Sequence, residues 1–236
     1  MEIPKDISVG MDAANKITSD YHTNQMFSYQ FLGINQERPK ETLLLHQIHS
    51  NKVLTIDKNS KIPKNDEIKA DAIVTNQKNL KIAIKTADCI PILLFSKDRG
   101  GIIAAIHAGW RGAKDNIVTN AINEMQKLGA KSQNIQCFIG PCIRKESYQI
   151  SQEFYQDFIN EDPNFKKFFI EDKAKSDHFL FNLPEFVKEK LQKEGISKIK
   201  DDLIDTYPSK CYNSYRAFCH GKKLDNGRNI SYILLK

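Results

Sequence analysis

The sequence has no long apolar run and no pattern typical of an export signal. Its longest apolar segments, residues 91–95 and 101–106, are far too short to cross a membrane. Residues 1–10 lack the basic segment followed by an apolar segment that a secretory signal requires. We therefore expect a cytoplasmic protein that does not associate with membranes.

Cysteine is scarce and irregularly spaced, at positions 89, 137, 142, 211 and 219. An odd number of cysteines without an export signal argues against a disulfide framework and for a reducing compartment. Cys137 and Cys142 flank a Gly-Pro turn, but no second pair accompanies them, so we expect packing cysteines rather than a structural zinc site.

Dense runs of lysine and arginine interleaved with aromatic residues are also missing, although the net charge is +6 and the pI is near 8.9. We therefore predict no nucleic-acid partner. A basic balance raises the local concentration of small anions such as phosphate, but scattered lysines can equally reflect genome bias. With 236 residues, 40% of them apolar, the chain is long enough for one domain with a substantial core.

The sequence predicts strands and helices in irregular alternation. Alternating or continuous apolar residues indicate strands at 42–49, 52–56, 71–75, 81–86, 91–95, 101–107, 135–139 and 229–235. Apolar spacing and capping residues indicate helices at 117–128, after Ser151 and after Asn182. Residues 1–40 show no clear periodicity. Strands and helices that alternate without regular βαβ units favour the α+β class.

Three reactive side chains lie at or just beyond the ends of predicted strands: His49, Cys89 and His107. If strands 91–95 and 101–107 form a hairpin, the start of one lies beside the end of the other, which brings Cys89 close to His107. Two imidazoles and a thiolate are typical ligands of zinc, or of copper in a softer site. Three protein ligands also leave one position open for water or substrate.

The same residues allow other interpretations. A single histidine near a strand end is more often structural, and a single buried cysteine more often fills an apolar gap. Cys89 could instead be a nucleophile with His107 as its base. Asp88 could orient a histidine, although adjacent residues of a strand point to opposite sides. A Cys–His pair does not need His49, whereas a metal site does.

Two further segments are suited to substrate binding. The run at 109–112, Gly-Trp-Arg-Gly, is expected to lead directly into the central helix, where Gly109 would allow close approach and Arg111 could grip a phosphate. Alternatively, Trp110 packs in the core and Arg111 pairs with a carboxylate. The aromatic, amide and arginine side chains at 212–216 could stack on a flat heterocycle, although an exposed strand would look the same.

Together these segments resemble the laccase-domain family, also described as multicopper polyphenol oxidoreductases, bacterial purine nucleoside phosphorylases or peptidoglycan editing factors. The matching segments are Gln47-Ile48-His49 with Val53, residues 70–75 (Ala-Asp-Ala-Ile-Val-Thr), 86–91 (Thr-Ala-Asp-Cys-Ile-Pro), 105–112 (Ala-Ile-His-Ala-Gly-Trp-Arg-Gly), 139–143 (Ile-Gly-Pro-Cys-Ile), and Ser214-Tyr215-Arg216 with Gly227-Arg228. Their order and approximate spacing hold from about residue 42 to the end.

The resemblance implies a single domain over residues 1–236, with 1–40 as a divergent N-terminal segment, and an α/β/β/α sandwich with mixed β-sheets. Matched position by position, it implies that His49, Cys89 and His107 bind zinc or copper. It also implies phosphorolysis of adenosine, inosine and methylthioadenosine, together with deamination of adenosine. We expect a monomer that acts on a purine nucleoside and phosphate.

We assign catalytic roles to the three expected metal ligands and Asp88. Substrate and phosphate binding is assigned to Gly109, Arg111, Ser214, Tyr215 and Arg216. Phosphorolysis also needs an acid for the departing purine, and Asp71 and Asp88 are both candidates.

The chain also departs from the family's pattern. The usual glycine-containing N-terminal run is missing, and only Phe-Leu-Gly-Ile-Asn at 31–35 resembles the segment after it. Asp205 stands where the family tends to have cysteine, and Ala217 and Phe218 replace an arginine and an aspartate. These departures bear on substrate preference and phosphate affinity. A Cys–His amidohydrolase acting in peptidoglycan precursor editing, a copper-dependent polyphenol oxidase and a binding protein with a vestigial site are the alternatives.

Overall fold

The computed structural model describes residues 22–34 and 36–236, in which two large sheets and one small sheet form. The five-stranded sheet has the order β1 (His22–Thr23), β2 (Phe27–Leu32), β14 (Asn229–Leu235), β6 (Lys81–Thr86) and β3 (Thr42–Leu43). The six-stranded sheet has the order β13 (Lys198–Asp201), β9 (Ile135–Ile139), β7 (Ile90–Ser96), β8 (Ile102–Ala108), β5 (Ala72–Thr75) and β4 (Val53–Ile56). Both contain parallel and antiparallel neighbours.

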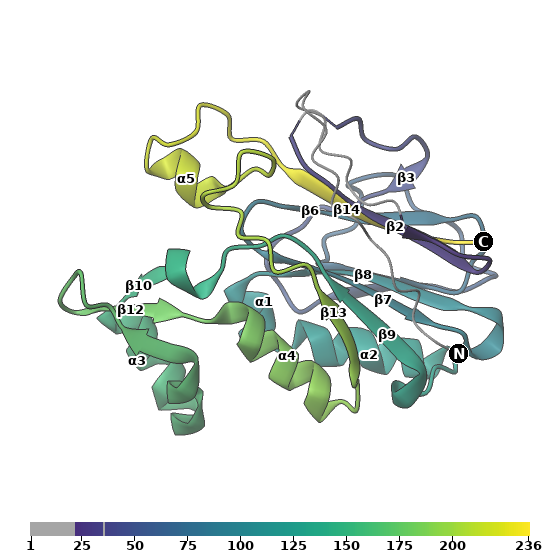
Figure 1. Cartoon of the computed structure of the whole chain (residues 1–236). Helices are drawn as coiled ribbons and strands as arrows, with labels where there is room; N and C mark the ends of the chain where they lie inside the picture. Colours follow the sequence, from purple (N-terminus) through teal and green to yellow (C-terminus); the bar gives the residue numbers. More distant parts are fainter. Residues whose placement is uncertain (1–21, 35) are drawn as a thin grey trace.

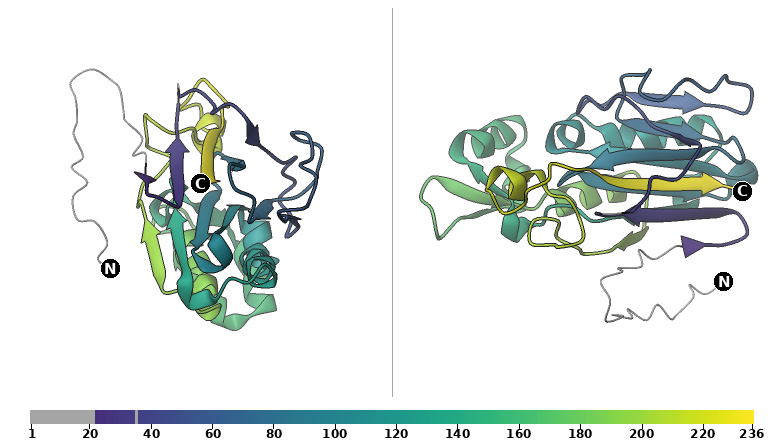
Figure 2. Two further views of the ribbon diagram at one scale, coloured as in Figure 1. Left: turned by 90° about the vertical axis from the view of Figure 1, so that its right-hand side faces the viewer. Right: turned by 90° about the horizontal axis from the view of Figure 1, so that it is seen from above.

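The two large sheets lie face to face, and helices cover the outer side of the six-stranded sheet (Figure 1). Of the helices, α2 (Ile117–Lys127) and α4 (Leu183–Lys193) lie on that side of the sheet in Figure 1, and the others are α1 (Trp110–Lys114), α3 (Gln152–Glu161), beside the small third sheet, and α5 (Tyr215–Cys219), at the upper left. Short 3-10 turns occur at Asp98–Gly100, Ser132–Asn134, Lys145–Ser147 and Pro163–Phe168. The view from the side in Figure 2 shows the same layers. The expected class, strands and helices with mixed sheets, is confirmed.

The central strands β7 and β8 are buried on both faces, which explains their continuous apolar sequences. In β7, Ile92 and Leu94 pack toward the helices, while Leu93 and Phe95 pack toward the five-stranded sheet. Between the sheets, the ring of Phe27 stacks on that of Phe95 with 4.1 Å between centroids. The sandwich is therefore joined by one apolar layer between the sheets and a second beneath the helices.

The third sheet, β10 (Gln149–Ser151), β12 (His178–Phe181) and β11 (Phe169–Glu171), packs with α3 around clustered phenylalanine rings. Phe158 lies 5.1 Å from Phe181 and 5.7 Å from Phe186 between ring centroids. In Figures 1 and 2 this small sheet and α5 lie at the same end of the molecule. That end is where the candidate site forms.

The predicted hairpin is confirmed, because β7 and β8 are antiparallel neighbours with Pro91 opposite His107. Ser151 and Asn182 cap α3 and α4 as predicted, accepting hydrogen bonds from the backbone N–H groups of Phe154 and Glu185. The strand predicted at 42–49 is mostly wrong, since only its first two residues form β3.

The expectation that residues 109–112 lead directly into the central helix is also wrong. They belong to the separate five-residue helix α1, and α2 begins only at Ile117. Asn116, between the two helices, has a left-handed backbone (φ 70°) and so separates them. Gly109 therefore caps a short helix rather than the long one.

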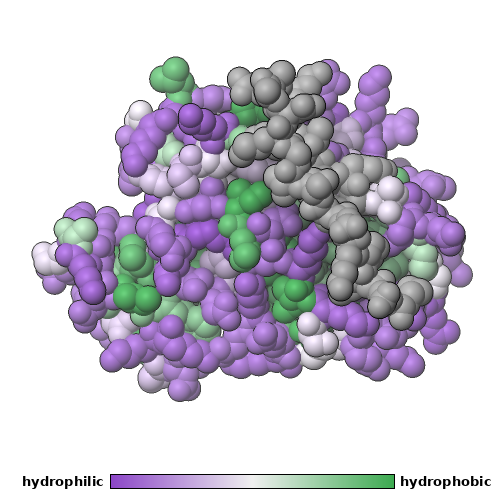
Figure 3. Space-filling view, viewed as in Figure 1, coloured by the Kyte–Doolittle hydropathy of each residue, from purple (hydrophilic) through white to green (hydrophobic). Residues whose placement is uncertain are grey.

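No helix in the described part of the chain is long and apolar enough to cross a membrane. On the face shown in Figure 3, apolar side chains outside the grey atoms form small, separate patches on a mostly hydrophilic surface. Scattered apolar residues of this kind are ordinary for a folded protein surface.

Candidate active site

The donor atoms of His49, Cys89 and His107, called the His–Cys–His set below, all lie within 4.8 Å of one another. His107 is near the end of β8 and Cys89 immediately precedes β7, so the β7–β8 hairpin brings them together as the sequence predicts. The rings of His49 and His107 are 4.7 Å apart between centroids and nearly perpendicular, at 81°. Residues up to 58 positions apart in the chain thus converge at one end of the sheet.

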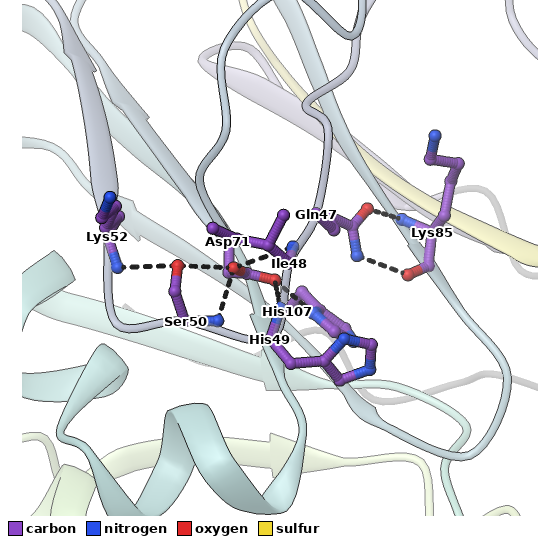
Figure 4. A network of polar contacts seen from close by, with 8 residues as sticks. All are labelled: Gln47, Ile48, His49, Ser50, Lys52, Asp71, Lys85 and His107. Carbon is purple, nitrogen blue, oxygen red and sulfur yellow. Dashed lines mark hydrogen bonds and ion pairs between the residues drawn. The ribbon is translucent and has the colours of Figure 1, made fainter.

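The carboxylate of Asp71 holds His49 in place, because the backbone of residues 48–50 turns around this carboxylate and donates hydrogen bonds to it (Figure 4). Asp71 is fully buried and accepts hydrogen bonds from the backbone N–H groups of Ile48, His49 and Ser50 at 3.2, 2.9 and 2.7 Å. The Ser50 hydroxyl donates a further bond at 2.7 Å. Because these amides point at one carboxylate, the segment cannot continue as a strand, and His49 adopts a left-handed backbone (φ 59°).

Asp71 also orients His107, whose Nδ1 lies 2.8 Å from its carboxylate (Figure 4). Burial raises the pKa of Asp71, but hydrogen bonds from His107 and Ser50 outweigh it and lower that pKa to about 2. An ionised carboxylate can only accept, so Nδ1 of His107 carries a proton and donates it. Nε2 is then left to act on the side of Cys89, an arrangement in which a carboxylate sets the tautomer of a metal-ligating histidine.

Cys89 and His107 favour opposite charges. Burial raises the pKa of Cys89, but the positive charge and hydrogen bonding of His107, assisted by His49, lower it to about 6. Burial lowers the pKa of His107, while the Cys89 thiolate and Asp71 raise it to about 9. The thiolate is the form that binds a metal or attacks an electrophile. By contrast, Cys137 and Cys142 are completely buried, and burial raises the pKa of both thiols.

Gly109 leaves room for this arrangement. A Cβ atom at this position would lie 3.0 Å from Cys89 Sγ and 3.1 Å from His49 Cδ2. Any larger residue would therefore push against two members of the His–Cys–His set. Glycine therefore allows a close approach of the backbone to the site that alanine could keep only if Cys89 or His49 shifted by a few tenths of an ångström.

The donor set fits a transition metal. Two imidazole nitrogens and one thiolate sulfur match the preferences of zinc and copper. One histidine already has the carboxylate partner that metal-ligating histidines usually have. Among the described residues, this is the one group of histidine, cysteine and acidic side chains close enough to hold a metal ion.

Asp88 does not orient a histidine, which corrects one of the interpretations considered above. Its carboxylate accepts hydrogen bonds from Thr206 Oγ1 and from the backbone N–H of Arg216, both at 2.7 Å. Its backbone is left-handed (φ 88°), and its carbonyl accepts a bond from Ile143 N at 2.9 Å. Asp88 therefore ties the segment that carries Cys89, between β6 and β7, to Thr206 and to the first turn of α5.

A cavity of about 960 Å³ opens over the His–Cys–His set, within the usual size range of small-molecule sites. Trp110 and Tyr148 line it with aromatic rings, and Lys85, Arg216 and Arg228 line it with positive charge. Lys85 is paired with Asp66 at 2.9 Å. The cavity thus combines flat apolar surface with cations beside the candidate metal ligands.

The residues predicted to bind substrate occupy different positions. Tyr215 and Arg216 line the cavity. Ser214 is buried and caps α5, accepting a hydrogen bond from Ala217 N, so the segment at 212–216 is not an exposed strand. The exposed guanidinium of Arg111 stacks on Trp110 at 4.5 Å, and Arg111 is not among the residues that line the cavity.

Sequence reasoning missed Tyr148, which lines the cavity. Burial, followed by the charge of the Cys89 thiolate, raises the pKa of its phenol. Tyr148 follows a 3-10 turn in a polar segment with no periodicity or motif of its own. Only its position in the fold reveals it.

Comparisons with known proteins place the chain among relatives along nearly its whole length. A family model described as multi-copper polyphenol oxidoreductase laccase matches residues 13–236. A purine nucleoside phosphorylase of Rickettsia prowazekii is 39% identical over 205 residues, which cover 86% of this chain and 81% of that protein. An adenosine deaminase from an unknown prokaryotic organism is 34% identical over 123 residues, 50% of this chain and 47% of that protein. The crystal structure of a Neisseria meningitidis protein shares the fold, with a TM-score of 0.73 and 22% identity over 93% of this chain and 98% of that one.

Proposed function

The chain belongs to the multi-copper polyphenol oxidoreductase laccase family, and from this premise we propose that it is a metal-dependent purine nucleoside phosphorylase that also deaminates adenosine. The observation that carries the proposal is the His–Cys–His set within a cavity that also holds aromatic rings and cations. The names of relatives, purine nucleoside phosphorylase and adenosine deaminase, support the same two reactions. Adenosine, inosine and methylthioadenosine are the proposed substrates.

His49, Cys89 and His107 are the proposed ligands of zinc, or of copper. When bound, such an ion supplies Lewis-acid polarisation of a substrate or nucleophile oxygen. The protein's own contribution is to present a thiolate and two imidazoles in a fixed arrangement. Asp71 provides that arrangement by orienting both histidines.

In phosphorolysis, an oxygen of phosphate attacks C1′ of the ribose as the bond between C1′ and the purine nitrogen breaks, and the purine takes up a proton. Trp110 and Tyr215 offer rings for stacking on the purine, and Arg216 offers charge for the phosphate. Asp71 is unsuited to donate the proton, because its pKa is about 2 and its carboxylate accepts five hydrogen bonds. Of the two carboxylates considered, Asp88 remains, and it lines the cavity.

A nucleoside assay on metal-loaded protein tests the proposal. We expect adenosine to yield adenine and ribose 1-phosphate only when phosphate is present, and inosine to form with or without phosphate. Cys89→Ala should lose both the bound metal and both activities. Full activity in metal-free protein, or unchanged metal content in Cys89→Ala, would contradict the site. Absence of both products would contradict the function.

A second candidate function is a Cys–His amidohydrolase, favoured by the alignment of Asp71, His107 and Cys89. In that arrangement the carboxylate orients the imidazole, which in turn activates the thiol as a nucleophile. His49 separates the two candidates, because the amidohydrolase does not need it. Hydrolysis of a peptidoglycan-derived amide by chelator-treated protein and by His49→Ala, without nucleoside turnover, would support this candidate. Oxidation of phenols by copper-loaded protein would support a polyphenol oxidase instead.

A further inference from the structure

Tyr148 is held rigidly at the wall of the cavity. Its backbone N–H donates to Lys145 O at 3.2 Å, and its carbonyl accepts from Phe181 N at 3.0 Å. Its ring lies 5.7 Å from the ring of Phe181, between centroids. The backbone is therefore held by the preceding 3-10 turn and by β12 of the third sheet, which also contacts the ring, so the side chain needs little ordering when a ligand binds.

The Arg216 guanidinium lies over the ring of Tyr148, 5.0 Å from the ring centroid. Its Nη1 donates to the carbonyl of Gln149 at 2.6 Å, which leaves its other N–H groups for a ligand. Within residues 22–34 and 36–236, no carboxylate forms an ion pair with Arg216, and no hydrogen bond is formed by the Tyr148 hydroxyl. A positive charge thus lies over the ring of Tyr148, and both residues line the cavity.

From this pairing we propose that the Tyr148 hydroxyl and the Arg216 guanidinium together bind the inorganic phosphate used in phosphorolysis, an inference that rests on the proposed function. A phosphate dianion needs both charge and several hydrogen-bond donors. Arg216 supplies the charge and a forked set of N–H groups, and Tyr148 supplies a neutral donor that stays protonated at neutral pH. Arg111, the arginine first expected to grip phosphate, lies outside the cavity lining.

Tyr148→Phe is the discriminating variant, because it removes the hydroxyl and keeps the ring that contacts Arg216 and Phe181. Its matched control is Tyr155→Phe, since the Tyr155 ring stacks on Phe179 at 4.1 Å and does not line the cavity. Calorimetric titration of each metal-loaded protein with inorganic phosphate measures the dissociation constant directly. We expect Tyr148→Phe to bind phosphate about tenfold more weakly, from the loss of one hydrogen bond to a charged group, and Tyr155→Phe to bind it like the wild type.

Steady-state kinetics supply a second measurement: the KM for phosphate should rise in Tyr148→Phe, while the KM for adenosine should change much less. An unchanged dissociation constant in Tyr148→Phe, or no phosphate binding by the wild type, would overturn the inference. If phosphate binds in a Tyr148-dependent way but adenosine yields no ribose 1-phosphate, the phosphate site stands and the proposed phosphorolysis fails. The two proposals are therefore tested separately.

Discussion

Replacing Asp71 by asparagine would remove the buried charge around which both histidines of the His–Cys–His set are arranged. The carboxamide keeps the shape but has one oxygen instead of two. If the NH₂ group of the asparagine faces Ile48 and Ser50, one donor meets other donors. The backbone N–H groups of Ile48 and Ser50 then lose the oxygen that accepts their hydrogen bonds in the wild type. If it faces His107, it can pair with Nδ1 only when the proton moves to Nε2, the nitrogen needed on the side of Cys89.

The magnitude follows from these contacts. The carboxylate is 0% exposed and accepts five hydrogen bonds, three of them from backbone amides. Leaving a buried donor without its partner costs about 1–3 kcal/mol, and breaking a buried ionic contact about 3–5 kcal/mol. We therefore expect Asp71→Asn to lower the free energy of unfolding by about 3–5 kcal/mol and metal affinity by about 10- to 100-fold.

Urea unfolding of the metal-free protein measures the first effect, and competition with a chromophoric chelator measures the second. Asp98→Asn is a matched control, because Asp98 also accepts several hydrogen bonds, from Ser96 Oγ, Lys131 N and Asn134 Nδ2, but lies away from the cavity. It should lose stability and keep its metal affinity. A metal dissociation constant within threefold of wild type in Asp71→Asn, or an equal loss in Asp98→Asn, would refute the reasoning.

Acid unfolding gives an independent check on the same carboxylate. The pKa of Asp71 is about 2 when folded, against an ordinary value of 3.8. The folded state therefore favours the ionised carboxylate. The contribution of Asp71 to the free energy of unfolding is fully present above about pH 4 and is lost as the pH falls through about 2. The difference between the two pKa values corresponds to about 2 kcal/mol of free energy of unfolding. Asp71→Asn should lack this part of the pH dependence of unfolding between pH 4 and 2.

Three further predictions concern the site and its support. Gly109→Ala should lower metal affinity about tenfold in a folded protein, because the added Cβ lies 3.0 Å from Cys89 Sγ; a wild-type dissociation constant would contradict this. Zinc at 100 times its dissociation constant should stabilise the wild type by about 2.7 kcal/mol in thermal unfolding and leave Cys89→Ala unchanged. Arg144→Met should lower the free energy of unfolding by about 3 kcal/mol, because it breaks the nearly buried two-bond contact with Asp201; metal content should not change.

Much of the sandwich could be predicted from local patterns. The strands at 81–86, 135–139 and 229–235 have the predicted bounds, because alternating or continuous apolar residues reflect burial on one or both faces. The β7–β8 hairpin follows from two apolar runs around a polar turn, and it places Cys89 beside His107. These features depend on residues close together in the chain, which is why the sequence alone determines them.

The rest was decided by contacts between distant segments. Residues 44–49 look like a strand, but the amides at 48–50 bond to Asp71, more than 20 positions away, and this long-range contact overrides local β-propensity. Contacts between distant segments also place Tyr148 in the cavity lining and Arg111 outside it. The sequence therefore determined which residue types were available for a metal site. Only the tertiary structure decided which carboxylate orients the histidines and which tyrosines line the cavity, because hydrogen-bond partners and cavity walls are chosen in space rather than along the chain.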